Sequence, residues 1–95
     1  MTMKIQQIGD ADRGKFFIKE NDRQIGLMTY KKSGDREITI DHTEVDSNHR
    51  GEGLGEDLVA AAVKYAREND LKIVPTCPFA KKIIDDKPEF QDVLA

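Results

Sequence analysis

This sequence lacks paired cysteines, long apolar runs and an excess of positive charge, and each absence excludes a class of protein. The single cysteine, Cys77, has no partner within the chain, which argues against a disulfide-stapled secreted protein and fits a reducing compartment. No apolar run reaches the length needed to cross a bilayer, and residues 1–6 lack the apolar middle of a signal peptide. We therefore expect a cytoplasmic protein without membrane contact.

The charge balance bears on partners. The chain carries 15 lysines and arginines against 18 aspartates and glutamates, which gives a net charge of −3. A chain with this net charge lacks the positive electrostatic field that attracts nucleic acid phosphates, so we expect no nucleic acid partner. The pairs Lys31-Lys32 and Lys81-Lys82 are too short to be basic tracts, although such a pair can contact a phosphate at a site argued on other grounds.

The length and composition favour one folded unit. A chain of 95 residues can bury roughly 60–65% of its unfolded surface, which is enough for one core. Isoleucine, leucine, valine and phenylalanine recur in patterned stretches, so a folded domain is favoured over disorder. No repeat, linker or low-complexity segment divides the chain. We expect residues 1–95 to form a single domain, with a monomer and a weak homodimer both left open.

Three extended stretches are predicted in the first half of the chain. They cover residues 15–20, 24–32 and 36–45. Asn21-Asp22 supplies a tight turn after the first stretch, and Ser33-Gly34 reverses the chain after the second. In the third stretch the alternation places four residues on one face, namely Ile38, Ile40, His42 and Glu44. Together the stretches predict an antiparallel meander.

From residue 53 to residue 67 the period changes to that of an amphipathic helix. Its apolar face consists of Leu54, Leu58, Ala61, Ala62, Tyr65 and Ala66. Asn69 is expected to end this helix in a left-handed conformation, and residues 71–74 follow as a short strand parallel to the third stretch. Pro78 and Pro88 can each open a short helix. The predicted class is α/β (α+β): a meander, a strand-helix-strand crossover and short C-terminal helices.

Three alternating glycines, Gly51, Gly53 and Gly55, fall between the third stretch and the helix. At a helix start several backbone N–H groups lack partners, and an anion is their natural complement. Glycine suits such a loop because a side chain would hold the backbone away from a phosphate and because the loop often needs positive φ. Glu56-Asp57 follows the last glycine, which excludes a P-loop, and the Gly-x-Gly-x-Gly spacing after a meander disfavours a dinucleotide fingerprint. The loop therefore predicts an anion site of another kind.

With Arg50 the loop becomes Arg50-x-x-Gly53-x-Gly55, which resembles the Gln/Arg-x-x-Gly-x-Gly/Ala signature of the GNAT acetyltransferase superfamily. From His42 to Phe79 the chain resembles, more narrowly, the compact GNAT-like family, and the resemblance spans nearly the whole chain. It implies a GNAT-like fold with acetyl-CoA or coenzyme A as co-substrate, the pyrophosphate on the loop amides and the pantetheine arm between two splayed parallel strands. The residues then expected at the coenzyme are Val45, Arg50, Gly51, Glu52, Gly53, Leu54, Gly55, Phe79 and Lys82.

The chain departs from the larger GNAT enzymes on the acceptor side. Those enzymes place two helices between their first two strands, whereas only Asn21-Asp22 occupies the connection here. The resemblance therefore implies an acceptor cleft that is open or completed by another chain. Because Glu52, Glu56 and Asp57 put negative charge near a polyanionic ligand, we expect modest coenzyme affinity.

Three residues are candidates for catalysis. Cys77 precedes Pro78 and can cap a short helix, whose N-terminus lowers a thiol pKa; the alternative is a small buried apolar residue. The resemblance implies a candidate active-site cysteine at this position. His42 and Glu44 can each act as a base through water, and their structural alternatives are a hydrogen-bonded histidine and an exposed carboxylate. His49 is expected in the loop near the phosphates, and no metal site is expected because the histidines and the cysteine lack zinc-ligand spacing.

The leading functional hypothesis is an acetyl-CoA-dependent N-acetyltransferase that transfers acetyl to a primary amine of an unidentified acceptor. Transfer is either direct or through an acetyl thioester on Cys77. The alternative is a module that binds acetyl-CoA or CoA with little or no catalysis. A third hypothesis, an interaction domain that keeps only the scaffold, predicts no coenzyme binding.

Overall fold

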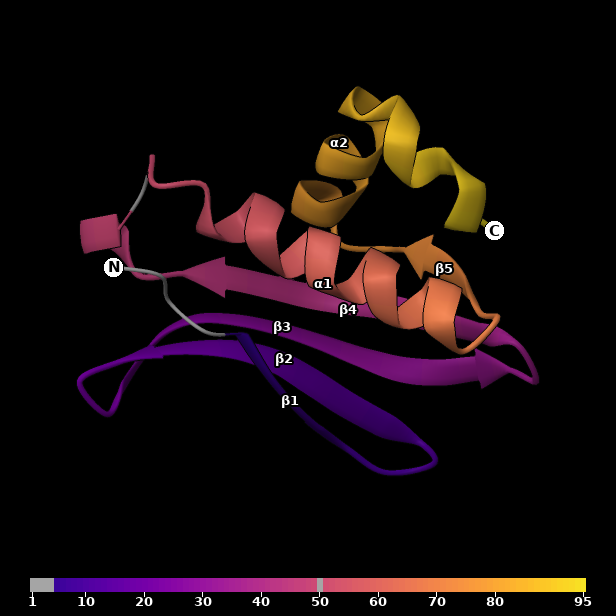
Figure 1. Ribbon diagram of the computed structural model, residues 1–95, viewed down its shortest axis with the longest axis horizontal. Coiled ribbons are helices and arrows are strands. Elements are labelled where there is room, and N and C mark those ends of the chain that lie inside the picture. Colours follow the sequence, from indigo (N-terminus) through magenta and orange to yellow (C-terminus); the bar gives the residue numbers. More distant parts are fainter. Residues whose placement is uncertain (1–4, 50) are drawn as a thin grey trace.

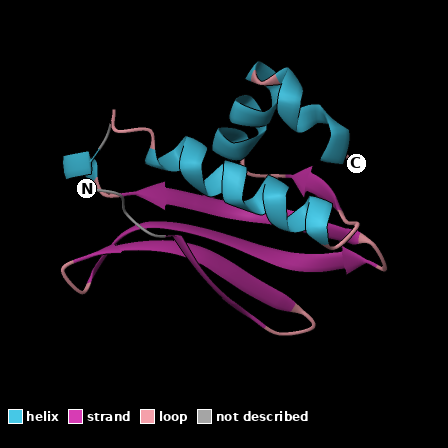
Figure 2. Ribbon diagram, in the orientation of Figure 1, coloured by secondary structure: helices cyan, strands magenta, loops and turns pink. Residues whose placement is uncertain are grey.

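The computed structural model describes residues 5–49 and 51–95. Its elements are β1 (Ile5–Gly9), β2 (Arg13–Glu20), β3 (Arg23–Gly34), β4 (Glu37–Val45), a 3₁₀ turn (Ser47–His49), α1 (Leu54–Glu68), β5 (Lys72–Pro75), α2 (Pro78–Asp86) and a second 3₁₀ segment (Pro88–Val93). The strands form one five-stranded sheet in the order β1-β2-β3-β4-β5. Both α-helices lie on the same side of it (Figure 1), and the described helices leave its other face uncovered (Figure 2).

The sheet confirms the predicted meander and crossover. β2, β3 and β4 pair antiparallel, and β4 pairs with β5 in parallel across α1. Asn21 and Asp22, at φ 51° and 66°, form the predicted tight turn, since positive φ at both central residues matches the twist of a hairpin. The described sheet also contains β1, which the sequence did not predict. This strand pairs with β2 from Ile5↔Ile18 to Gly9↔Gly14, and its exposed central glutamines, Gln6 and Gln7, hide the apolar alternation.

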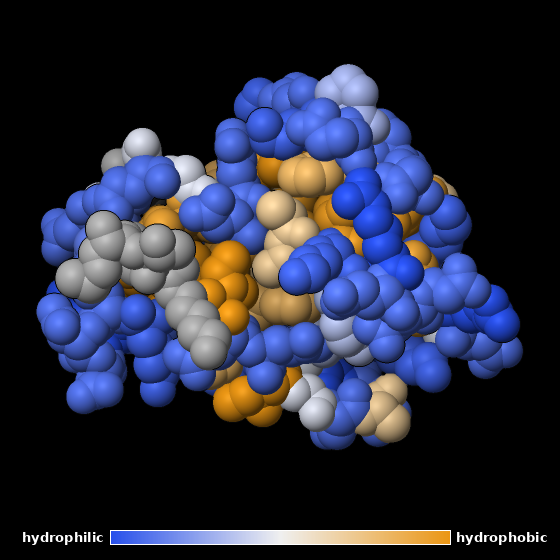
Figure 3. Space-filling model, in the orientation of Figure 1, coloured by the Kyte–Doolittle hydropathy of each residue, from blue (hydrophilic) through white to orange (hydrophobic). Residues whose placement is uncertain are grey.

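The core lies between α1 and the covered face of the sheet. Leu58, Val59, Ala62, Val63 and Ala66 are fully buried and recur at the spacing of one helix face. They pack with residues of the sheet in one cluster, whose strand members include Phe16, Ile18, Met28, Ile40 and Ile73. Hydrophilic side chains cover most of the face in Figure 3, with apolar residues in separate patches among them. α1 is thus held by packing onto the sheet, because a helix of this length has little stability alone.

The end of α1 differs from the prediction by one residue. Asn69 has φ −111°, and the left-handed residue is Asp70, at φ 55°. Leu71 N–H bonds to the Ala66 carbonyl at 2.8 Å and Asp70 N–H to the Arg67 carbonyl at 3.4 Å, which is the bond pair of a Schellman motif. The prediction that Asn69 is the left-handed residue at the end of the helix was therefore wrong. The side-chain amide of Asn69 instead donates to the Tyr65 carbonyl at 2.9 Å.

The C-terminal segment closes over β5. α2 and the following 3₁₀ segment begin at Pro78 and Pro88, as predicted. The Arg67 guanidinium donates to both Asp92 carboxylate oxygens, at 2.9 and 2.7 Å, and Ala95 N–H bonds to the Ile73 carbonyl at 2.9 Å. None of the helices within residues 5–49 and 51–95 is both long and apolar enough to cross a membrane.

Candidate functional site

The parallel strands β4 and β5 separate halfway along β4. Their pairing runs from Glu37↔Lys72 to Ile40↔Pro75. The Ile40 carbonyl then accepts the N–H groups of Thr76, at 3.0 Å, and Cys77, at 3.2 Å, and the chain turns away into α2. Beyond Ile40, no strand in the described part of the sheet pairs with the edge of β4 that faces β5. The last residues of β4 thus present a backbone edge that an extended ligand can use.

A β-bulge at Asp41 coincides with this separation. Thr29 pairs with His42 and Tyr30 pairs with Ile40, so Asp41 is an extra residue on β4. Because side chains alternate along a strand, the bulge reverses which residues face the core. The prediction that Ile38, Ile40, His42 and Glu44 share one face was therefore wrong.

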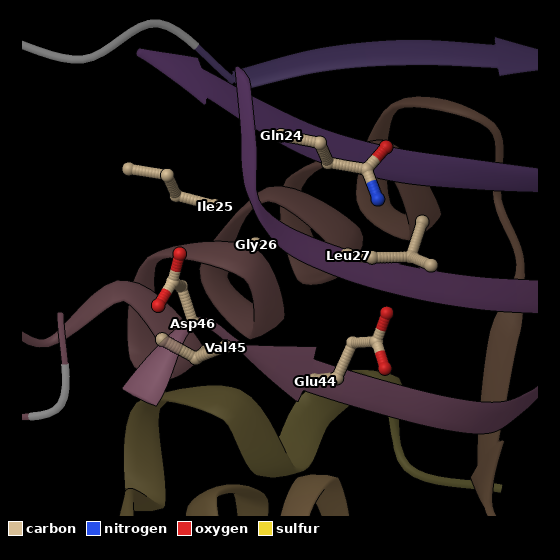
Figure 4. A pocket seen from close by; sticks show the side chains of 7 residues that line it. All are labelled: Gln24, Ile25, Gly26, Leu27, Glu44, Val45 and Asp46. Carbon is tan, nitrogen blue, oxygen red and sulfur yellow. The ribbon is translucent and has the colours of Figure 1, made fainter. Parts of the chain in front are cut away.

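The pairing partners show the new orientation. Thr43 lies opposite the buried Met28, and so points to the covered face. His42 and Glu44 lie opposite Thr29 and Leu27, and so point to the uncovered face. Figure 4 shows the Leu27 and Glu44 side chains turned toward the same space, at a small cavity of about 210 Å³ beside the end of β4.

The glycine loop ends in an exposed helix N-terminus. Gly51 and Gly53 have φ 85° and 79°, a left-handed conformation that residues with side chains rarely adopt, and a Cβ at either position would meet nothing within 4 Å. Gly53 is the N-cap of α1, and its carbonyl accepts the Asp57 N–H at 3.0 Å. By helix geometry the N–H groups of Leu54, Gly55 and Glu56 have no acceptor within α1. The loop thus has the positive φ and the free amides predicted for an anion site, while Arg50 lies outside the described residues.

Gly55 serves packing rather than the loop conformation. It lies in the first turn of α1 and is buried, and a Cβ there would lie closer than 3.0 Å to two atoms of the Phe79 ring. The missing side chain makes room for Phe79, which projects from the first turn of α2 and remains 48% exposed. Close approach of a phosphate is therefore not the reason that the structure gives for glycine at this position.

A groove of about 840 Å³ joins the free edge of β4, the glycine loop and α2. Its lining residues are Thr43, Glu44, Val45, His49, Gly51, Gly53, Leu54, Gly55, Glu56, Phe79, Lys82, Ile83 and Asp86. The groove brings together the residues predicted at the coenzyme, except Arg50, which the structure does not describe, and Glu52, whose carboxylate bonds to His49. Sequence reasoning missed Thr43 and Ile83, which nothing marked as ligand contacts before the bulge and α2 placed them here.

His49 ties the loop to the β2–β3 turn. Its Nδ1 lies 3.1 Å from the Glu52 carboxylate, and its Nε2 lies 3.6 Å from Glu20. The hydrogen bond to Glu52 raises the pKa of His49 above 6.5, and the nearby carboxylates of Glu20 and Asp46 add to the rise. His49 lines the groove, as predicted for a residue near the phosphates, and its imidazole links the glycine loop to the β2–β3 turn at the same end of the sheet.

Lysine charge at the groove is largely balanced. Lys82 lies 3.3 Å from Asp86, and Lys87 lies 3.6 Å from Glu56. Lys81 pairs with Asp85 at 2.7 Å and does not line the groove. Of the two lysines that the sequence offered as offsetting charges, Lys82 is thus the one at the groove.

Cys77 is the N-cap of α2 and is 9% exposed. Burial raises the pKa of its thiol, but the Ala80 N–H, the Thr43 hydroxyl and the Phe79 N–H lower it, and the net pKa lies below 9.0. The Thr43 hydroxyl is buried and forms no hydrogen bond with any described residue, the thiol included, so it acts on the pKa of Cys77 through its proximity. Cys77 does not line the groove; it lies behind Thr43, as a buried thiol in surroundings that favour thiolate.

His42 and Glu44 form a separate pair. His42 Nε2 lies 3.3 Å from Glu44 Oε2, and the side chains are 56% and 60% exposed. Since Thr43 and Cys77 are on the covered side of β4, the three predicted catalytic residues do not form one cluster. Glu44 nevertheless also lines the groove, at its edge. Elsewhere in the described residues, no group of three or more histidine, cysteine, aspartate or glutamate side chains is placed to hold a metal ion.

Solved structures share this fold. The solution structure of a GCN5-like protein from Staphylococcus aureus is 36% identical, with a TM-score of 0.77, over 97% of this chain and 87% of that chain. A Bacillus anthracis protein solved in complex with acetyl coenzyme A is 24% identical, with a TM-score of 0.65, over 80% of this chain and 48% of that chain. The first likeness extends to sequence, whereas the second concerns the fold alone.

Sequence comparison gives the family. Protein NATD1 of Gallus gallus is 33% identical over 87 residues, which cover 88% of this chain and 77% of that protein. Residues 15–93 match the family described as GCN5-related N-acetyl-transferase. With the five-stranded sheet and the separated β4 and β5, these matches show that the chain belongs to the GCN5-related N-acetyltransferase family.

Proposed function

We propose that this protein transfers the acetyl group of acetyl-CoA to a primary amine. The observation that carries the proposal is the groove in which the free edge of β4 meets the N-terminus of α1. One wall offers backbone amides for phosphate, and the other offers an unpaired strand edge for an amide-bearing chain. Acetyl-CoA contains both groups in one molecule, and a structural neighbour was solved in complex with it.

The pyrophosphate fits the start of α1. The N–H groups of Leu54, Gly55 and Glu56 point out of the helix, and the positive φ of Gly51 and Gly53 exposes the loop backbone. An empty space surrounds the position of a Cβ at both glycines, so a phosphate can approach the main chain. Each charge-assisted hydrogen bond contributes roughly 1.5–3 kcal/mol.

The pantetheine arm fits the edge of β4 beyond Ile40. An amide-bearing chain can bond to a strand edge as another strand would. Val45 and Phe79 supply apolar contacts on the two sides of the groove, and Lys82 supplies a positive charge at its rim. This placement directs the thioester toward Thr43 and the bulge at Asp41.

In direct transfer the amine nitrogen attacks the thioester carbonyl carbon. The carbon–sulfur bond breaks, the CoA thiolate leaves, and the nitrogen loses a proton. Glu44 can take that proton through water, since it lines the groove edge on the uncovered face, and His42 lies beside it at 3.3 Å. Both residues thus remain candidates for the base.

In the alternative route the Cys77 thiolate attacks first. The acetyl group moves to sulfur with loss of the CoA thiolate, and the amine then attacks the acetyl thioester and restores the thiol. The lowered pKa of Cys77 favours the thiolate, whereas its position behind Thr43 requires the thioester to pass that side chain.

Two variants separate the routes when CoA release is measured with an amine in excess. Cys77→Ala abolishes transfer by the thioester route and leaves direct transfer intact, while Glu44→Gln slows the direct route if Glu44 is the base. A general base contributes about 10²–10⁴-fold to rate. Full activity in Cys77→Ala eliminates the thioester, and full activity in Glu44→Gln eliminates Glu44 as base.

A second candidate is a module that binds acetyl-CoA with little turnover. The uncovered face of the sheet favours it, because the described helices all lie on the opposite side and build no acceptor wall (Figure 2). Calorimetric binding of acetyl-CoA without CoA release across a panel of amines supports this candidate, and turnover with any of them excludes it.

A further inference from the structure

A second groove, of about 950 Å³, lies on the uncovered face of the sheet. Lys15 and Thr29 line it, and both point away from the core because they are neighbours of the buried Phe16 and Tyr30 on β2 and β3. The groove runs from the turn between β1 and β2 to Asp41 on β4. Ile8, which is 60% exposed, gives it one apolar side.

The end at β4 is acidic. The Thr29 hydroxyl donates to the Asp41 carboxylate at 2.6 Å, which holds that carboxylate over the uncovered face. Asp41 is the bulge residue that follows Ile40, where β4 and β5 stop pairing. An ammonium group held by Asp41 is therefore next to the place to which the proposed coenzyme site directs the thioester.

The opposite end is basic. Arg13, Lys15, Lys31 and Lys32 line it, and within residues 5–49 and 51–95 none of these side chains forms a salt bridge with a carboxylate. Asp10 and Asp12 are also present.

Two features limit the effect of these carboxylates. Asp10 Oδ1 is engaged by the backbone N–H groups of Asp12, at 2.8 Å, and Arg13, at 3.0 Å. Arg13, Lys15 and Lys31 alternate onto the uncovered face, so three cations face two carboxylates, and this end keeps a positive balance and can hold an anionic group.

We propose that this groove binds the acceptor, and that the acceptor is a primary amine with an anionic group at its far end. The inference rests on the proposed acetyl transfer and specifies its substrate class. Thr29 and Lys31 lie two residues apart on one face of β3, which places the two charged ends about 7 Å apart at about 3.4 Å per residue. A ligand whose ammonium and carboxylate groups lie about 7 Å apart can therefore contact Asp41 and Lys31 at the same time.

Three amines of equal chain length test the charge requirement: 5-aminopentanoate, pentylamine and 1,5-diaminopentane. They present the same primary amine with an anionic, a neutral and a cationic far end. We expect kcat/KM for CoA release to be about two- to fivefold higher for 5-aminopentanoate than for pentylamine, since 5-aminopentanoate forms one more exposed ion pair, and a single exposed pair has an effect of this order. The diamine is expected to be the poorest acceptor.

Charge-reversal variants locate the effect. Lys31→Glu should invert the order and make 1,5-diaminopentane the best of the three, and Lys15→Glu should do the same more weakly. Lys64→Glu is the matched control, because Lys64 is an exposed lysine on α1 outside this groove, and it should leave the order unchanged. Asp41→Asn should raise KM for all three amines and leave acetyl-CoA affinity unchanged.

The outcomes separate this inference from the proposed function. Equal kcat/KM for the three amines, or an unchanged order in Lys31→Glu, overturns the groove while acetyl transfer stands. CoA release with none of the amines overturns acetyl transfer and the acceptor groove together. Backbone amide shifts give a readout independent of turnover: 5-aminopentanoate added to the CoA-loaded protein should shift Thr29, Lys31 and Asp41, and shifts confined to other residues overturn the assignment.

Discussion

Gly55→Ala tests how the groove that we propose to bind acetyl-CoA is built. Gly55 lies in the first turn of α1 under the ring of Phe79, and an added Cβ would lie closer than 3.0 Å to two ring atoms. Those atoms are the far end of a side chain that is 48% exposed, so the ring can turn away without disturbing the core. We expect the substitution to remove Phe79 from the groove wall and leave α1 in place.

Two opposing contributions decide the stability of this variant. Alanine is better than glycine in a helix by about 0.8–1.0 kcal/mol. Against this, Phe79 loses its contact with α1, which costs about 1 kcal/mol for a ring that is already half exposed. The free energy of urea unfolding should therefore stay within about 1 kcal/mol of the wild type, whereas acetyl-CoA affinity by calorimetry should fall to that of Phe79→Ala.

The double variant, Gly55→Ala with Phe79→Ala, tests whether Gly55 acts only by making room for the Phe79 ring. In the Phe79→Ala background the added methyl meets no ring, so Gly55→Ala should increase stability by about 0.5–1 kcal/mol and leave affinity unchanged. A further loss of affinity in this background shows that Gly55 itself approaches the phosphate, as the sequence predicted. Destabilisation of the single variant by more than about 2 kcal/mol shows that the ring is fixed.

Three other predictions concern the same groove. Gly53→Val should strain the left-handed N-cap of α1 and weaken acetyl-CoA binding by about 1.5–3 kcal/mol through at least one lost charge-assisted hydrogen bond. Calorimetry on the folded variant measures this loss, and Gly53→Asn, which tolerates positive φ, should lose less. The Glu52 hydrogen bond raises the pKa of His49, so their pairing stabilises the protein fully below pH 6.5 and is lost as pH rises through the raised pKa. The difference in urea midpoint between wild type and Glu52→Gln should accordingly shrink with rising pH, and a constant difference contradicts the pairing. Thr43→Val removes a hydroxyl that lowers the pKa of Cys77, so alkylation by iodoacetamide should shift to higher pH, and an unchanged midpoint refutes that contact.

Strong periodicity explains which elements were predictable. The helix predicted over residues 53–67 forms as Leu54–Glu68, because its apolar stripe has a single favourable way to meet the sheet. β1 escaped prediction, since a strand at the sheet edge with exposed glutamines at its centre carries no alternating pattern. Sequence patterning reports burial, and an edge strand with one partner buries little.

The bulge at Asp41 shows a different limit. The run from Ile38 to Glu44 alternates without a visible break, so nothing local announces an extra residue. The bulge arises from register with β3, which fixes Thr29 opposite His42 and Tyr30 opposite Ile40. Register depends on two strands at once, and one strand's pattern cannot supply it.

The same distinction between local properties and strand register applies to the candidate site. The place of the glycine loop before α1 was predictable because positive φ and a helix start are local properties, and Phe79 and Lys82 line the groove because of their place on α2. The neighbours of Cys77 were not predictable: Thr43 reaches the thiol only after the bulge turns it to the covered face. The local properties of each segment can thus be predicted from the sequence, whereas the strand pairing decides which side chains come together in one site.

The bulge also bears on the order of chemical steps. It places Glu44 and His42 on the uncovered face and Cys77 behind Thr43 on the covered side, so one amine cannot meet both sets while the coenzyme occupies the groove. An amine that approaches across the uncovered face meets the carboxylates, which favours direct transfer in a ternary complex. Initial rates at varied acetyl-CoA and amine should then give intersecting double-reciprocal lines, and Cys77→Ala should leave that pattern unchanged. Parallel lines that become intersecting or vanish in Cys77→Ala would show instead that acetyl resides on the thiol and that CoA leaves before the amine reacts.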